Sequence, residues 1–131
     1  MTDRETLLRY RISQAEETLA DAEAMKKAGL STRSIVNRAY YSMFYAVLGL
    51  FLKTDLVVKT SKHSGIISMF DQAFTLSGKI DRDFSKSLHK MFNLRQVADY
   101  KELVEVSSED AEDALKQAAD FVKEIKRVIF G

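Results

Sequence analysis

The chain has 131 residues, of which 46% are hydrophobic and 30% charged, and these proportions are typical of one soluble globular domain. Its formal net charge of +1 excludes a globally basic nucleic-acid coat protein but is compatible with a local basic patch. The sequence contains no cysteine, which excludes disulfides and thiolate chemistry and suits a reducing cytoplasm. It also contains no proline, and with its long periodic runs this predicts a single all-α domain over residues 1–131.

The first predicted helix begins at Thr2 and ends at Gly29. Thr2 and Glu5 have the spacing of a capping box, and glycine commonly follows the last turn of a helix. The charged N-terminus lacks the apolar run of a signal peptide, so we expect a cytoplasmic protein. Apolar residues recur at helical spacing along this helix, at Leu8, Ile12, Ala15, Leu19 and Ala22.

The second predicted helix begins at Ser31 or Thr32 and continues to about Lys53. Residues 39–48 are apolar on nearly all sides, which is typical of a helix that is central in a bundle or shared with another subunit. The apolar stretch over 39–52 is shorter than the roughly 20 residues that cross a bilayer, so no membrane span is predicted.

Three further helices are predicted after a short linker over residues 54–60. They are a short helix that begins at Thr60 or Ser61 and ends near Gly78, a helix over 82–100 capped by Asp81, and a last helix that begins at Ser107, with Asp110 at its third position. The pattern predicts an antiparallel four-helix bundle with one additional short helix.

An arginine interrupts the apolar face of the fourth predicted helix. Phe84, Leu88 and Met91 form its apolar stripe, and the next position on that face is Arg95. Asp99 follows one turn later and is a suitable ion-pair partner. The pair is either a structural link to the neighbouring helix or part of a functional site at an interface.

Polar candidates also lie on the second predicted helix, where Asn37 and Arg38 precede Tyr40, Tyr41 and Tyr45. The tyrosines either pack in the core with local hydrogen bonds or, like arginine, contribute to a binding surface. Asn37 and Arg38 are candidates to contact a phosphate or a base.

Lys62 and His63 open the third predicted helix, where backbone N–H groups can bind an anion. The alternative is an ordinary helix start with a solvated lysine. Neither His63 nor His89 has a glutamate three residues before it, as a di-iron site in a helical bundle requires, so no metal site is predicted. No glycine-rich phosphate loop is present, and no cofactor is predicted.

Three blocks of the sequence, in order, resemble the HEPN domain family: residues 37–46 (NRAYYSMFYA), 62–65 (KHSG) and 94–100 (LRQVADY). The resemblance covers about residues 5–125 and is greatest to the small stand-alone prokaryotic branch. It implies an antiparallel four-helix bundle that is usually a homodimer. Many members of this branch are encoded beside a minimal nucleotidyltransferase and act with it as a toxin–antitoxin pair.

Active members of the family resemble metal-independent endoribonucleases in which two copies form one cleft. Their motif is an arginine, which neutralises the phosphate, followed after four to six residues by a histidine that assists proton transfer at the 2′-hydroxyl. Arg95 matches this arginine, but Tyr100 stands where the histidine is expected. His89 precedes Arg95 by six residues and is in the wrong order, whereas His63, on another predicted helix, stays open as a substitute. A tyrosine, with a pKa near 10, is a poor base at neutral pH but can donate a hydrogen bond. Tyr100 is also the candidate acceptor if a transferase partner modifies a tyrosine.

Three functions are therefore expected candidates. The first is an RNA-acting toxin, controlled by a nucleotidyltransferase, with Arg95 and Tyr100 as candidate catalytic residues. The second is a non-catalytic module that binds a nucleotide or RNA. The third is a dimeric docking module for the nucleotidyltransferase. The candidate nucleotide- or RNA-binding residues are Asn37, Arg38, Tyr41, Lys62, His63 and Asp99.

Overall fold

The computed structural model describes residues 1–100 and 104–131, and the side chains of all of these except Tyr100. Within this part of the chain the prediction of an all-helical fold is confirmed, because it contains five α-helices and no strand. The elements are α1 (Asp3–Lys27), α2 (Thr32–Lys53), α3 (His63–Phe70), the π-helical turn η1 (Asp71–Thr75), α4 (Arg82–Tyr100) and α5 (Ser108–Phe130).

The helix ends follow from local side-chain chemistry. The Thr2 hydroxyl accepts a hydrogen bond from the Glu5 N–H (3.1 Å), as predicted for the start of α1. Ser107 and Asp110 form a complete capping box at the start of α5. Gly29 follows α1 with φ +72°, a backbone conformation that glycine adopts without a steric penalty.

The start of α3 differs from the prediction. The helix begins at His63 rather than at Thr60 or Ser61, and its N-cap residue Lys62 makes no side-chain capping bond. The Thr60 hydroxyl instead accepts from the Lys62 N–H (3.1 Å) in the preceding loop. Thr60 also packs against Gly65, where an added Cβ would lie only 2.5 Å from the threonine methyl group. This arrangement makes His63 the first residue of the helix.

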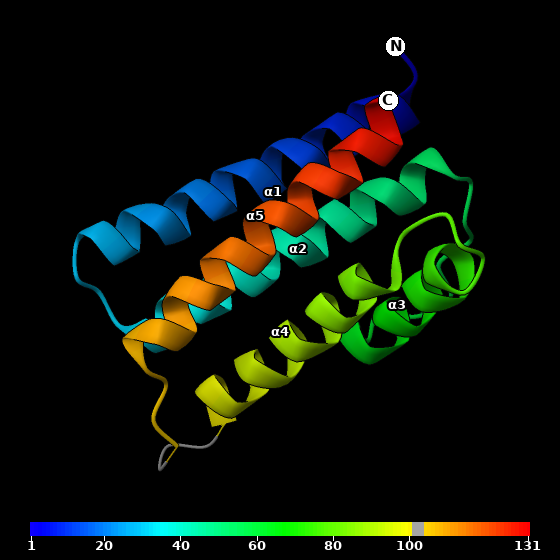
Figure 1. Cartoon of the computed structure of the whole chain (residues 1–131). Helices are drawn as coiled ribbons and strands as arrows, with labels where there is room; N and C mark the ends of the chain where they lie inside the picture. The colour runs from blue at the N-terminus through cyan, green and yellow to red at the C-terminus, as the bar shows by residue number, and fades with distance from the viewer. Residues whose placement is uncertain (101–103) are drawn as a thin grey trace.

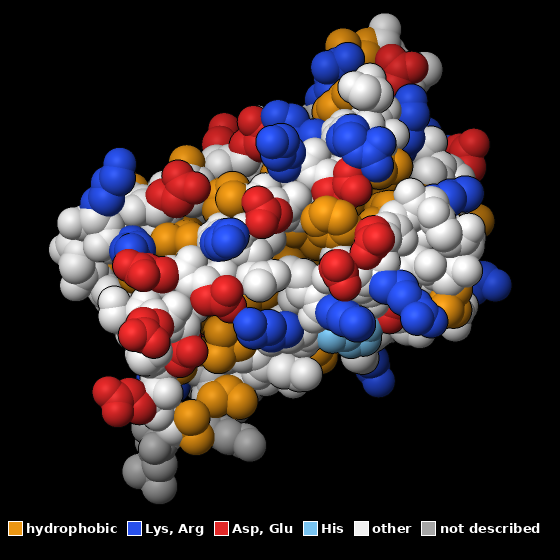
Figure 2. All heavy atoms as spheres, viewed as in Figure 1, with side chains coloured by type: hydrophobic (Ala, Val, Ile, Leu, Met, Phe, Trp, Pro, Cys, Tyr) orange, Lys and Arg blue, Asp and Glu red, His pale blue; other side chains and the backbone are white. Residues whose placement is uncertain are grey.

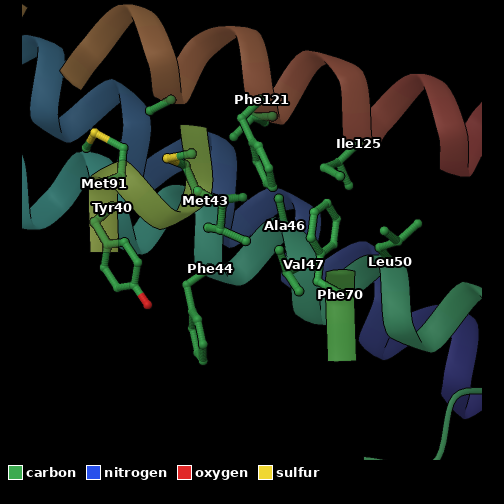
Figure 3. Close-up of a cluster of buried hydrophobic side chains, with 14 of the residues drawn as sticks. Tyr40, Met43, Phe44, Ala46, Val47, Leu50, Phe70, Met91, Phe121 and Ile125 are labelled. Carbon is green, nitrogen blue, oxygen red and sulfur yellow. The ribbon is translucent and has the colours of Figure 1, made fainter. Parts of the chain in front are cut away.

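Helix α2 is the central element, because it contacts α1, α4 and α5 (Figure 1). In Figure 1 the two chain termini lie near one another at one end of the molecule, while α3 and α4 lie together on the side away from α1. The core around α2 contains side chains from α3, α4 and α5 as well (Figure 3). The buried residues labelled there include Met43, Val47, Leu50, Phe70, Met91, Phe121 and Ile125.

Helix α2 is also long and apolar enough to cross a membrane, with 22 residues and a mean hydropathy of 1.2 in its most apolar window. Length and composition therefore do not exclude a membrane span, although the continuous apolar stretch over residues 39–52 is too short for one. However, 67% of that window is buried inside the molecule. Such burial is typical of the core helix of a soluble protein.

Candidate functional site

Arg95 lies on the packing face of α4, as the apolar pattern predicts. Leu88 and Met91, the preceding residues on this face, are fully buried, and the Arg95 side chain is only 15% exposed. Its Nε lies 2.9 Å from Oδ2 of Asp99, one turn further along the helix. The expected ion pair is therefore present, and it holds the guanidinium in a fixed position between α4 and α2.

Two tyrosines of α2 surround this guanidinium. Arg95 Nη2 donates a hydrogen bond to the Tyr41 hydroxyl (3.2 Å). The guanidinium carbon is 5.4 Å from the centre of the Tyr41 ring and 5.9 Å from that of Tyr40, distances at which a cation attracts an aromatic face. From the same helix, Asn37 Nδ2 donates to Oδ2 of Asp99 (3.2 Å). Hydrogen bonds thus connect both members of the ion pair to α2.

His63, at the start of α3, joins this group through the aromatic side chains of α2. Its Nδ1 lies 2.9 Å from the Tyr40 hydroxyl. Its ring stacks on Phe44, with centres 4.0 Å apart and planes at 11°, and the edge of Tyr41 meets it at 5.6 Å. In Figure 3 the Tyr40 and Phe44 side chains point away from α5. We call Asn37, Tyr40, Tyr41, His63, Arg95 and Asp99 the Arg95 cluster.

The electrostatics of the Arg95 cluster favour neutral forms of His63 and Tyr40. Burial, and then the nearby positive charge of Arg95, lower the pKa of His63 below its ordinary value. Burial raises the pKa of Tyr40, although Arg95 opposes this shift. At neutral pH the cluster therefore combines a guanidinium with an uncharged imidazole and a protonated phenol.

Two of the predicted binding residues do not join this cluster by any contact described. Arg38 approaches Asp21 of α1 instead, with Nη2 3.8 Å from the carboxylate. Lys62 is exposed next to His63 in the sequence.

Tyr100 ends α4, and the position of its side chain lies outside the described residues. The second histidine, His89, binds Asp71 Oδ2 (2.6 Å) at the π-helical turn and does not belong to the Arg95 cluster.

Sequence reasoning missed two supporting features. The sequence does not distinguish Tyr40 from Tyr41 and Tyr45. In the structure Tyr40 is fully buried and its hydroxyl contacts His63. A tyrosine on the core face of a helix needs a hydrogen-bond partner, and this need is the signal that could have identified it. Arg33 was not singled out at all. Its guanidinium donates to the backbone carbonyls of Ala98 and Val104, which lie on either side of residues 101–103. No local sequence pattern distinguishes Arg33 from an ordinary surface arginine.

The arrangement can bind an anion and accept a proton. A guanidinium is a planar set of N–H donors that matches the oxygens of a phosphate, and a neutral imidazole has a nitrogen lone pair that can take a proton. No group of three or more histidine, aspartate or glutamate side chains that could hold a metal ion is found among the described residues.

Comparisons with known proteins agree with this architecture. Residues 8–128 match the HEPN domain. A UPF0332 protein of Thermotoga maritima is 36% identical over 129 residues, which is 98% of this chain and 96% of that protein. Two proteins of Methanocaldococcus jannaschii named "Putative toxin" are 32% and 36% identical; each alignment covers 90% of this chain, and 78% and 85% of those proteins. The chain therefore belongs to the HEPN domain family.

Proposed function

We propose that this chain is a toxin-like HEPN protein that acts on RNA, with Arg95 binding a phosphodiester. The observation that carries the proposal is the position of Arg95, since a core-facing arginine is held beside a neutral histidine by two tyrosines and an aspartate. Relatives of similar length that are named "Putative toxin" support the toxin-like part of the proposal.

RNA binding would depend on the local positive charge of Arg95 rather than on the net charge of the chain. In Figure 2, basic and acidic side chains alternate over the visible face, in keeping with the net charge of +1. A single partly buried arginine can still bind a phosphate strongly, because a guanidinium makes two parallel hydrogen bonds to its oxygens. The phosphate would compete with Asp99 for Arg95, so both residues affect the affinity.

The test is cleavage of RNA by the purified protein in EDTA, which removes metal-dependent ribonucleases as a source of activity. We expect the wild-type protein to cleave and Arg95→Ala to lose cleavage by about 10²- to 10³-fold, as when one charge-stabilising donor is removed from an active site. Arg38→Ala is the matched control, because Arg38 approaches an aspartate outside the Arg95 cluster. Equal cleavage by wild type and Arg95→Ala would contradict the proposal.

A non-catalytic module is the second candidate function. Tyr100 stands at the position of the family's motif histidine, which favours a protein that binds RNA or a nucleotide without cleaving it. Salt-sensitive RNA binding by a wild-type protein that shows no turnover would support this candidate. Absence of both binding and turnover would favour a docking module.

We also propose a minimal nucleotidyltransferase as partner in a cytoplasmic toxin–antitoxin pair. The resemblance of the three blocks to the stand-alone HEPN branch supports this partner. Co-expression should allow the two proteins to be purified together and should relieve growth inhibition caused by this chain alone. Mass spectrometry after incubation with the partner and ATP would show whether Tyr100 is modified.

A homodimer built on the four-helix bundle of the family is the third part of the proposal. Half-buried apolar residues follow one side of α2 at helical spacing, and the exposed Leu7 and Val58 line one hollow together with Leu48 and Leu52 of α2. Exposed apolar surface of this kind favours self-association. Sedimentation equilibrium should give twice the monomer mass, and a monomer at all concentrations would contradict it. The half-buried residues are Tyr41, Tyr45, Leu48 and Leu52.

A further inference from the structure

We propose that His63 of α3, held by the Tyr40 hydroxyl, is the proton acceptor for RNA cleavage in this chain. This inference rests on the proposed function. It assigns the proton-transfer role to a different helix from the one that carries the family's motif histidine. Tyr100, which occupies the motif position, then has no need to act as a base.

The His63 ring is held by contacts on several sides. Phe44 stacks on it with centres 4.0 Å apart, Tyr41 meets it edge-on, and the Tyr40 hydroxyl lies 2.9 Å from Nδ1. Because Tyr40 is fully buried, its hydroxyl is itself fixed in position. The contact with Tyr40 uses Nδ1, so Nε2 is the ring nitrogen that can meet a substrate.

Tyr41 joins the imidazole to the arginine. Its ring contacts His63, and its hydroxyl accepts a hydrogen bond from Arg95 Nη2 (3.2 Å). The positive charge of Arg95 also acts on the imidazole and disfavours its protonated form. A phosphate-binding group and a proton acceptor are therefore placed around one tyrosine side chain, although they come from different helices.

The role requires the tautomer of His63 that carries its proton on Nδ1. In that tautomer the imidazole donates a hydrogen bond to the Tyr40 oxygen, 2.9 Å away, and presents a lone pair at Nε2. The same hydrogen bond persists after Nε2 takes a second proton, and it then stabilises the imidazolium. A histidine whose pKa is below its ordinary value is neutral, and so able to accept a proton, at neutral pH.

The step is a transfer within the RNA backbone. His63 Nε2 takes the proton of the 2′-hydroxyl, and the 2′-oxygen attacks the adjacent phosphorus while the bond from phosphorus to the 5′-oxygen breaks. The products are a 2′,3′-cyclic phosphate and a 5′-hydroxyl. Water supplies the proton of the leaving oxygen, and the hydroxide formed takes the proton from the imidazolium. Arg95 stabilises the negative charge that develops on the non-bridging oxygens.

His89 provides a matched control for this assignment. It is the second of two histidines in the chain, its side chain is 50% exposed, and its Nε2 binds Asp71. A histidine-to-asparagine change at either position removes one imidazole. Only the change at His63 affects the Arg95 cluster.

The experiment compares wild type, His63→Asn and His89→Asn for RNA cleavage in EDTA and for binding of a 2′-O-methyl RNA, which cannot be cleaved. An asparagine amide at position 63 can keep a hydrogen bond to Tyr40 but cannot accept the proton. We expect His63→Asn to lose about 10²-fold or more in cleavage, as is typical when a general base is removed. RNA binding by His63→Asn should fall far less than its cleavage does, and His89→Asn should match wild type in both assays.

If His63→Asn lowers the melting temperature, the dependence of wild-type kcat/KM on pH provides a second test that does not depend on this variant. The acidic limb of wild-type kcat/KM should coincide with the pKa of His63 measured by NMR, and His89→Asn identifies the second histidine signal. Tyr40→Phe should move this limb to lower pH, because the imidazolium loses a hydrogen-bond acceptor. A limb that does not follow the His63 titration would overturn the assignment.

The outcomes separate this inference from the proposed function. If wild type cleaves and a folded His63→Asn cleaves equally well, the assignment of His63 is wrong and the role of Arg95 stands. If wild type does not cleave but binds RNA through Arg95, the assignment also fails, and the non-catalytic module is favoured. If Arg95→Ala changes neither binding nor cleavage, the proposed function itself is wrong.

Discussion

The two halves of α2 meet very different surroundings. The C-terminal half carries Val47, Leu50 and Phe51, which are buried among the aromatic and aliphatic side chains of the core. The N-terminal half carries Asn37 and the tyrosine pair, which contact an ion pair and a histidine. Apolar burial stabilises a fold by about 25 cal/mol per Å², whereas a hydrogen bond contributes only about 1 kcal/mol net. The C-terminal half therefore contributes to stability through apolar burial alone, whereas the N-terminal half also places an ordered polar site beside α4.

The largest effect on stability is expected in the apolar core that contains the C-terminal half of α2. Phe121 of α5 is fully buried and contacts the rings of Phe70 and Phe84. Phe121→Ala should lower the free energy of unfolding by about 3–5 kcal/mol, because it removes apolar contacts and leaves a cavity. Urea denaturation measures this change. Cleavage per folded molecule should be retained. A loss of activity in fully folded Phe121→Ala would contradict the separation of the stabilising core from the polar site.

Arg95→Lys tests the polar site, where we expect an effect on cleavage rather than on stability. Lysine keeps the positive charge but loses the planar set of donors that bonds both Tyr41 and Asp99. We expect RNA cleavage to fall by about 10²-fold, while the free energy of unfolding changes by only about 1 kcal/mol. Steady-state cleavage and urea denaturation on the same sample test both parts. A loss of stability as large as that of Phe121→Ala would mean that Arg95 is chiefly a structural residue.

Asp99→Asn should strengthen RNA binding. Asp99 is the carboxylate that would compete with a phosphate for Arg95, and asparagine keeps a similar shape without the negative charge. An exposed or partly exposed ion pair is worth about 1 kcal/mol at most, so the affinity should rise by up to about fivefold. Titration of a labelled 2′-O-methyl RNA measures the change. Weaker binding by the variant would show that Asp99 chiefly orients Arg95.

The smallest expected effect is a dependence of stability on pH. Burial and Arg95 lower the pKa of His63, so the unfolded chain binds this proton more readily than the folded one. The free energy of unfolding should therefore fall as the pH drops below about 6.5, the ordinary pKa of histidine. His63→Asn should lack this part of the dependence, whereas His89→Asn should keep it. Urea denaturation from about pH 7.5 to about pH 5 tests the difference.

Much of the helical pattern was predictable because it depends on local chemistry. Periodic apolar residues and the caps at Thr2 and Ser107 predict where α1 and α5 begin, and the interrupted stripe predicts that Arg95 faces the core. The π-helical turn and the start of α3 were missed. Thr60 looks like a cap in the sequence, but its hydroxyl bonds within the loop and its methyl group packs on Gly65.

The composition of the site was only partly predictable. Asp99 lies on the same helix as Arg95, so its spacing alone predicts the contact. His63 is brought in by contacts of α3 with aromatic side chains of α2, and such contacts depend on how whole helices pack. Arg38 lies directly after Asn37 in the sequence, but consecutive helical residues point about 100° apart, and Arg38 turns to α1.

RNA binding through Arg95, between the polar half of α2 and the facing end of α4, underlies the proposed function. The most direct measurement is the affinity of wild type, Arg95→Ala and Arg38→Ala for a 2′-O-methyl RNA at low and moderate salt. We expect at least about tenfold weaker binding and a smaller salt dependence for Arg95→Ala, with Arg38→Ala close to wild type. Equal affinity of wild type and a fully folded Arg95→Ala would contradict it.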